Sequence, residues 1–157
     1  MATLSDEVDM LRRIPLFAAI DPGKLKLLAF ASDRMIYRDG QPICRQGEVG
    51  DAAYVVVNGT ADIVVETEGG KEIVVAEAKE NAVIGEIAIL CDVPRTATVR
   101  ARGELVALKI KKEHFLGLMM DFPKLGIQVM RELALRLSRT TAELTEARRQ
   151  LEAAKAG

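Results

Sequence analysis

Glycine turns alternate with short β-forming runs over residues 33–110, and this spacing limits the fold more than any other feature of the chain. The turns are marked by Gly40, Gly47, Gly59 and the pair Gly69-Gly70. Two runs alternate apolar and polar residues as half-buried strands do, with apolar positions at Ala61, Ile63 and Val65 and at Ala97, Val99 and Ala101. Residues 52–57 are apolar on both faces, which predicts a strand covered on both sides. Short strands at this spacing predict a barrel or a jelly-roll sandwich.

Helical patterns flank the β region on both sides. Residues 4–30 carry apolar residues at helical spacing, and the prolines at positions 15 and 22 divide them into short helices. A further helix is predicted from Lys111 to about Asp121, where Phe122-Pro123 breaks it, and a long helix follows to about Ala154. The expected fold is mainly β with flanking helices. Residues 1–122 would form the β-barrel unit and residues 123–157 a lid or dimerisation helix.

The composition excludes several classes of protein. The 157 residues are 49% hydrophobic and 29% charged, as in an ordinary soluble domain. A net charge of −1 argues against a dedicated nucleic-acid binder, which needs a basic excess. No apolar run approaches the roughly 20 residues that span a bilayer, and the N-terminus lacks the pattern of a secretory signal. Cys44 and Cys91 have no metal-ligand spacing, so we expect reduced thiols, a half-buried Cys91 and a cytoplasmic protein.

The chemistry is concentrated between Gly85 and Val99. This segment predicts a strand end, a Gly-Glu turn, one helical turn, a proline-containing loop and a new strand. Gly85 lets the backbone approach a ligand closely, and the start of the helical turn offers unpaired N–H groups to a phosphate. Arg95 can meet phosphate oxygens with a planar fork of donors, whereas the acceptor-only carboxylate of Glu86 suits a sugar hydroxyl. Together these features predict a ribose-phosphate site.

The same segment resembles the phosphate-binding cassette of the cyclic nucleotide-binding domain family. The resemblance rests on Gly85-Glu86-Ile87-Ala88 and Pro94-Arg95-Thr96-Ala97-Thr98-Val99. It extends in the right order over residues 12–122, with an early hairpin at residues 38–48 and the next strand and turn at residues 54–59. It implies a double-stranded β-helix fold and a site for cAMP or cGMP, which would act as a regulatory ligand.

The resemblance also assigns roles to single residues. Glu86 would take the ribose 2′-hydroxyl, Arg95 the exocyclic phosphate oxygens, and the backbone N–H groups of Ile87, Ala88 and Ala97 the rest of the phosphate. Apolar contacts to the base would come from Ile63, Ala76 and Ala78, and lid contacts from Arg131 or Arg136. The hydroxyl of Thr96 would bond the amino group of a syn guanine. One departure is the turn before Gly85, where Asn81 replaces the usual glycines; asparagine tolerates the left-handed conformation, so we expect the turn to form.

The sequence argues against an enzyme. Metal-dependent cupins share the barrel, but their sites need clustered histidines, and the single histidine, His114, is expected on the surface at the start of a helix. No nucleophile with a base partner is evident.

The long terminal helix carries a second signal. Its apolar residues follow alternating steps of three and four over about four heptads, at Met130, Leu133, Leu137, Thr140, Leu144, Ala147, Leu151 and Ala154. This seam predicts a parallel homodimer, with Glu143 facing Arg148 of the partner helix. A helix folded back on its own barrel would also show an apolar stripe.

Two other functions stay open at this level. One is the sensor of a transcription regulator of the catabolite activator type; such regulators continue into a DNA-binding helix-turn-helix, for which this chain leaves no room. The other is a degenerate module that only contacts an effector protein, against which the presence of both Glu86 and Arg95 counts. The identity of the effector is not encoded in any recognisable motif.

Overall fold

The computed structural model describes residues 3–18 and 20–157, so the first two residues of the predicted barrel unit lie outside it. Three short helical elements open the chain: α1 (Leu4–Arg13), the 3-10 turn η1 (Pro15–Phe17) and α2 (Pro22–Ala31). Thr3 caps α1 in a reciprocal pair with Asp6, whose pKa is lowered by the hydrogen bonds from Thr3. The breaks fall at the two prolines, as the sequence predicts.

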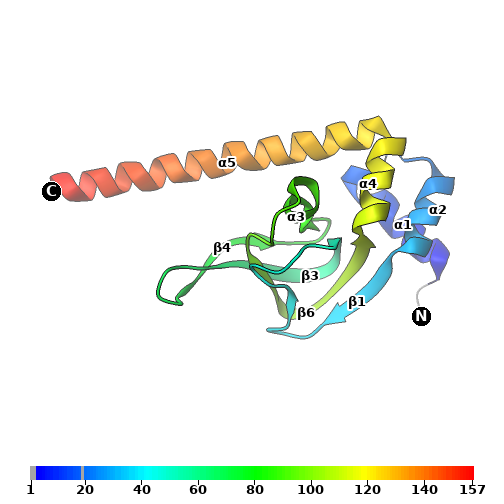
Figure 1. Ribbon diagram of the computed structural model, residues 1–157, viewed down its shortest axis with the longest axis horizontal. Helices are drawn as coiled ribbons and strands as arrows, with labels where there is room; N and C mark the ends of the chain where they lie inside the picture. The colour runs from blue at the N-terminus through cyan, green and yellow to red at the C-terminus, as the bar shows by residue number, and fades with distance from the viewer. Residues whose placement is uncertain (1–2, 19) are drawn as a thin grey trace.

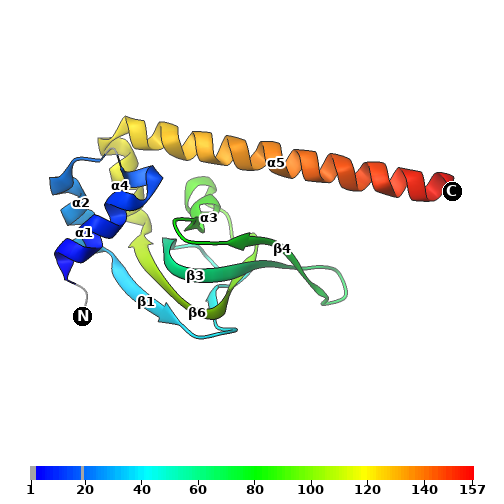
Figure 2. The same ribbon diagram turned by 180° about the vertical axis from the view of Figure 1, so that it is seen from behind.

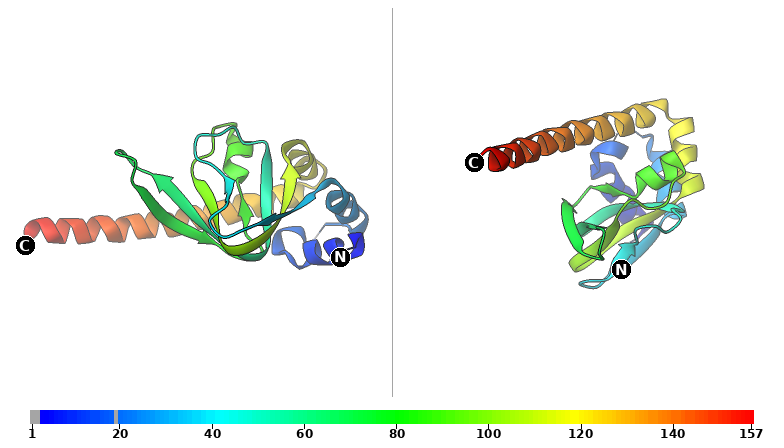
Figure 3. Two further views of the ribbon diagram at one scale, coloured as in Figure 1. Left: turned by 90° about the horizontal axis from the view of Figure 1, so that it is seen from below. Right: turned by 60° about the vertical axis from the view of Figure 1, so that its left-hand side comes forward.

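A single antiparallel sheet forms the centre of the molecule. Its strands are β1 (Asp33–Tyr37), β2 (Pro42–Cys44), β3 (Ala52–Glu66), β4 (Glu72–Ala78), β5 (Val83–Ile84) and β6 (Thr98–Lys111). The order is β1-β6-β3-β4, while β2 also pairs with β6 and β5 with β3. The sheet curls around its own apolar face, which is seen best from below in Figure 3. The predicted β fold with flanking helices is therefore confirmed.

The strand details follow the sequence closely, with one correction. Residues 52–56 are all buried, as expected for a strand covered on two faces, and Val99 and Ala101 point inward from β6. In β3, however, Val64 is buried, whereas Ile63 and Val65 are only partly buried. The register between β3 and β4 shifts at this point, and the extra residue of the bulge, Val75, belongs to β4.

Gly40, Gly47 and the pair Gly69-Gly70 lie in turns, as predicted, and each has a positive φ. Gly59 is a further correction: it was predicted to mark a turn, but it lies inside β3, where the register with β6 shifts. No other residue fits at Gly59. Its φ is +102°, and a Cβ there would lie 2.6 Å from the backbone oxygen of Glu104.

Two helices close the chain: α4 (Lys112–Asp121) and α5 (Pro123–Ala156). The first turns of α5 pack through Leu125 and Val129 on the core formed with α1, α2 and α4 at one end of the sheet, as Figures 1 and 2 show. From Ala134 onward every residue of α5 is exposed. The helix passes over the sheet near α3 and β4 and continues beyond the β3–β4 hairpin. No helix in residues 3–18 or 20–157 is long and apolar enough to cross a membrane.

Candidate functional site

A cavity of about 840 Å³ lies between the inner face of the sheet, the short helix α3 (Glu86–Cys91) and α5. All but one of the residues predicted for the site line it: Ile63, Ala76, Ala78, Gly85, Glu86, Ile87, Ala88, Arg95, Thr96, Ala97 and Arg136. The exception is Arg131, which is exposed and donates to Gln128 on the outside of α5. The structure thus gathers around one cavity residues from five strands, β2 to β6, and from the two helices α3 and α5.

Gly85 connects β5 to α3 in a left-handed conformation, with φ +84°. A Cβ at this position would collide with Nη1 of Arg95, so both the backbone angle and the space require glycine. The preceding turn uses Asn81 at φ +74°, which confirms the expectation that this residue replaces a glycine. The first N–H groups of α3 have no acceptor within the helix, and the residues of this turn, Glu86, Ile87 and Ala88, line the cavity together with Arg95.

Arg95 is the fixed centre of this end of the cavity. Its side chain is 5% exposed, and its guanidinium donates to the carbonyl oxygens of Gly85 (2.9 Å) and Ala52 (2.6 Å). The Tyr54 ring lies 5.9 Å from the guanidinium carbon. Within the described part of the chain, no carboxylate forms an ion pair with Arg95. A buried cation without a carboxylate partner is stabilised when it binds an anion.

Residues 47–50, in the loop before β3, hold the backbone of Arg95 in place by hydrogen bonds. The Arg95 N–H donates to the oxygen of Glu48, and the Gly47 N–H donates to the oxygen of Arg95, each at 2.8 Å. Gly50 lies against both α3 and the guanidinium, since a Cβ there would be 2.5 Å from that of Ala88. Arg95 is therefore positioned before any ligand arrives.

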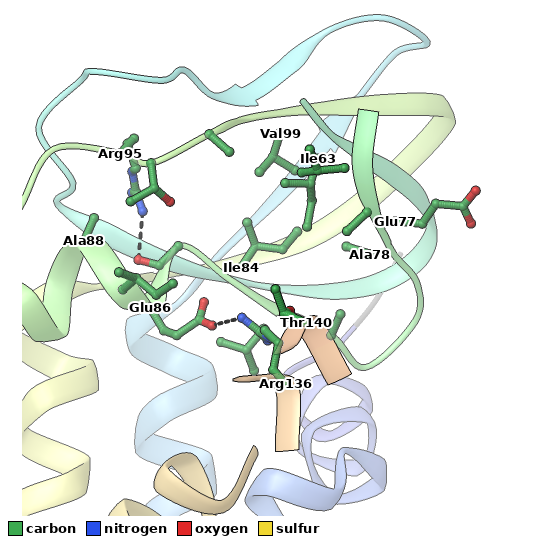
Figure 4. A pocket seen from close by; sticks show the side chains of 18 of the residues that line it. Ile63, Glu77, Ala78, Ile84, Glu86, Ala88, Arg95, Val99, Arg136 and Thr140 are labelled. Atoms are coloured by element: carbon green, nitrogen blue, oxygen red, sulfur yellow. Dashed lines mark hydrogen bonds and ion pairs between the residues drawn. The ribbon is translucent and has the colours of Figure 1, made fainter. Parts of the chain in front are cut away.

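Glu86 is the second buried charge, with 4% of its surface exposed. Its carboxylate pairs with Arg136 of α5, whose own side chain is 47% exposed (Figure 4). The two residues lie fifty positions apart in the chain. This ion pair is the one polar link shown between α5 and α3 among the described residues, and it places α5 over the acceptor that a sugar hydroxyl would use.

The opposite end of the cavity is apolar. Ile63, Ala78, Ile84 and Val99 line it (Figure 4), and Ala76, which pairs with Ile63 on the neighbouring strand, lines it as well. Beside them Cys44 is half-buried, and burial raises the pKa of its thiol. A thiol held in the protonated form is a poor nucleophile, so this wall offers surface for packing instead of a reactive group.

Sequence reasoning missed part of the α5 wall. Five further residues of this helix line the cavity: Arg139, Thr140, Glu143, Leu144 and Ala147. The signal for several of them was present, because positions 136, 140, 143 and 147 recur at helical spacing on one face. A second cavity of about 460 Å³ lies on the other side of the Glu86–Arg136 pair and shares both residues with the first.

Neither thiol nor the histidine adds a reactive centre. Cys91 is exposed, which corrects the expectation of a half-buried side chain: it ends α3 just before the left-handed Asp92, and the helix turns it outward. His114 is exposed in the first turn of α4, as predicted. In the described residues no group of three or more histidine, cysteine or acidic side chains could hold a metal ion.

Comparison with known proteins identifies the family to which this chain is similar. Residues 34–122 match the family described as the cyclic nucleotide-binding domain. A cAMP-dependent protein kinase regulatory subunit from Blastocladiella emersonii is 34% identical over 109 residues, which cover 69% of this chain and 27% of that protein. The chain thus spans about a quarter of the length of this relative.

Two solved structures share the fold. The regulatory domain of Toxoplasma gondii PKA, crystallised with cAMP, has a TM-score of 0.73 and 27% identity, covering 82% of this chain and 50% of that one. The catabolite activator protein of Thermus thermophilus has a TM-score of 0.73 and 29% identity, covering 83% of this chain and 61% of that one.

Proposed function

Because the chain belongs to the cyclic nucleotide-binding domain family, we propose that its cavity binds a cyclic nucleotide monophosphate, cAMP or cGMP, as a regulatory and non-catalytic module. The observation that carries the proposal is Arg95: a buried guanidinium, fixed by two backbone carbonyls and left without a carboxylate partner in the described residues. An anion is the partner that such a group lacks.

The phosphate would lie between Arg95 and the start of α3. A guanidinium carries more N–H donors than the two that Gly85 and Ala52 accept from Arg95, so donors remain for the exocyclic phosphate oxygens. The N–H groups of Ile87, Ala88 and Ala97 line the same end of the cavity. A singly charged phosphodiester there would neutralise a cation that the fold has already removed from water.

The ribose would bind beside Glu86. One carboxylate oxygen of Glu86 is paired with Arg136, which leaves the other as an acceptor for the 2′-hydroxyl. Arg136 would then stay paired with Glu86 beside the sugar, without any requirement that the ion pair break. The base would extend toward Ile63, Ala76 and Ala78, where the cavity is apolar.

The remaining predictions are proposals of the same kind. We assign residues 1–122 to the binding unit and residues 123–157 to a lid and dimerisation helix of a cytoplasmic regulator that acts on an effector protein.

Exposed apolar residues follow one stripe along α5: Leu137 is 67%, Leu144 52% and Leu151 56% exposed. A long helix with such a stripe gains stability from a partner helix, and a second copy supplies a matching seam.

Thermal unfolding and calorimetry test the proposal on the full chain. We expect cAMP or cGMP at about 1 mM to raise the melting temperature, because a ligand at 100 times its Kd adds about 2.7 kcal/mol to the free energy of unfolding. The linear nucleotide 5′-AMP is the control, since its phosphate carries more charge and is not tied to the ribose 3′ oxygen. If neither cyclic nucleotide raises the melting temperature, the chain is a degenerate module and the proposal fails.

A further inference from the structure

We propose that the second cavity, of about 460 Å³, is a regulatory site for a compact, uncharged aromatic molecule. The inference rests on the proposed function, because the molecule would act on the binding of a cyclic nucleotide in the first cavity, of about 840 Å³. The volume of the second cavity lies within the range of about 300–1,000 Å³ that small-molecule sites occupy in proteins.

The base of the second cavity is apolar and comes from residues that do not line the first. Pro15 of η1, Phe115 of α4, and Val129 and Leu133 of α5 line the second cavity alone. Phe115 and Val129 are buried in the main core, whereas Leu133 and Val83 are partly exposed and offer apolar surface to a ligand. An apolar base with a polar rim is the usual construction of a site for an aromatic ring.

The charged side chains around this cavity balance one another. Four of them are carboxylates, of which Glu77 pairs with Arg102 and Glu86 pairs with Arg136. The charged residues that remain are two acids and two bases, all of them exposed: Lys79, Glu80, Glu132 and Arg139. The rim therefore selects neither an anion nor a cation, and an uncharged ring enters the cavity without losing ionic hydration.

Glu86 and Arg136 couple the second cavity to the first, because both residues line both cavities. Five of the residues around the second cavity belong to α5, so the cavity is complete only while this helix lies against the barrel. A molecule bound there would stabilise the position of α5 in which Arg136 pairs with Glu86 at the proposed ribose site. Linkage then requires that the molecule and the nucleotide strengthen each other's binding by the same factor.

Calorimetry with indole, an uncharged bicyclic ring, tests the proposal on the full chain. Indole is similar in size to a purine, so it is titrated with and without a saturating concentration of whichever of cAMP and cGMP binds more tightly. With the first cavity occupied by the nucleotide, we expect indole to bind about fivefold more tightly or better, the lower end of typical coupling between sites. The reverse titration, nucleotide into the indole-saturated chain, should show the same factor.

Leu133→Trp fills the second cavity from a residue that does not line the first. It should abolish indole binding to the nucleotide-saturated chain and leave nucleotide binding in place, without a response to indole. Leu135→Trp is the matched control, because Leu135 is exposed on α5 and lines neither cavity. This variant should keep both indole binding and the coupling.

The outcomes separate the two proposals. Indole that competes with the nucleotide, or that does not bind the nucleotide-saturated chain, would overturn the second site and leave the proposed function intact. Equal effects of the two tryptophan variants would also overturn it. The reciprocal titrations on the wild-type chain decide the coupling even if Leu133→Trp does not fold. Failure of both cyclic nucleotides to bind would overturn the proposed function and the coupling together.

Discussion

Two parts of the cavity, the end around Arg95 and the wall formed by α5, are built in opposite ways. At the first end Arg95 is buried, and neighbouring segments hold both its side chain and its backbone. The α5 wall consists of exposed residues, and one ion pair, Arg136 with Glu86, links this helix to α3. The first end is part of the core of the barrel, whereas the second is a helix that leaves the core after Leu133.

This difference assigns the affinity for the ligand mainly to the Arg95 end and the conformational response to the α5 wall. A preorganised charge costs little to use, so most of the binding free energy is expected from Arg95 and the turn around Gly85. The α5 wall has few contacts to lose, and its position can vary with a small change in free energy. A ligand that touches both ends would shift the population of α5 positions while the barrel stays as it is.

The largest expected effect is the loss of the phosphate anchor. Arg95→Ala should weaken cAMP and cGMP alike by about 1.5–3 kcal/mol, the scale of hydrogen bonds to a charged group. Arg95→Lys should also bind poorly, because a single ammonium cannot replace the planar fork that reaches Gly85, Ala52 and the ligand together. Calorimetric titration of both nucleotides gives the two losses, and thermal unfolding without ligand checks that the variants fold.

Arg136→Ala is the matched change on the α5 wall. Arg136 is half exposed although Glu86 is buried, and the pair is formed without the ligand, so the loss in affinity should be about 1 kcal/mol and smaller than for Arg95→Ala. Equal losses for Arg95→Ala and Arg136→Ala would contradict the comparison, because they would place as much binding free energy on α5 as on the barrel.

Removal of the exposed part of α5 tests whether this wall belongs to a dimer. A chain ending at Arg136 keeps the ion pair with Glu86 and loses the exposed stripe at Leu137, Leu144 and Leu151. We expect the full chain to dimerise in a way that depends on concentration and ligand, since Thr140 and Ala147 bury little at the seam, and we expect the shortened chain to be a monomer.

Light scattering on both chains at matched concentrations, with and without cyclic nucleotide, measures this difference. Leu151→Glu in the full chain is a milder control, because it places a charge in the seam at a residue that does not line the cavity and leaves the helix intact. A monomeric full chain under all conditions, or a shortened chain that still dimerises, would show that the α5 stripe is not the interface.

The phosphate end was accessible to prediction because its signals are local. Gly85, Glu86 and Arg95 lie within one short segment, and its resemblance to a known cassette ordered these residues into a site. The same resemblance implied a left-handed turn before Gly85, which the sequence fills with Asn81. The prolines marked the helix breaks, but Gly59, predicted as a turn, lies inside β3.

The α5 wall was less accessible because it depends on tertiary packing. The pairing of Glu86 with Arg136 joins residues fifty positions apart and follows from the direction in which Leu125 and Val129 anchor the helix. Sequence reasoning named Arg136 but could not choose it over Arg131, and it assigned Glu143 to the dimer seam alone. The register shift beside Val64 was hidden in the same way, because it arises from the pairing of β3 with β4.

The smallest expected effect lies where the two ends meet the base. Thr96 follows Arg95 and lines the cavity, so its hydroxyl stands beside the fixed guanidinium. Thr96→Ala should weaken cGMP by about 1 kcal/mol, the scale of one neutral hydrogen bond to the guanine amine, and change cAMP less. Calorimetric titration of both nucleotides into the wild-type chain and the variant measures the two losses. Equal losses for both nucleotides would place Thr96 at the phosphate and not at the base.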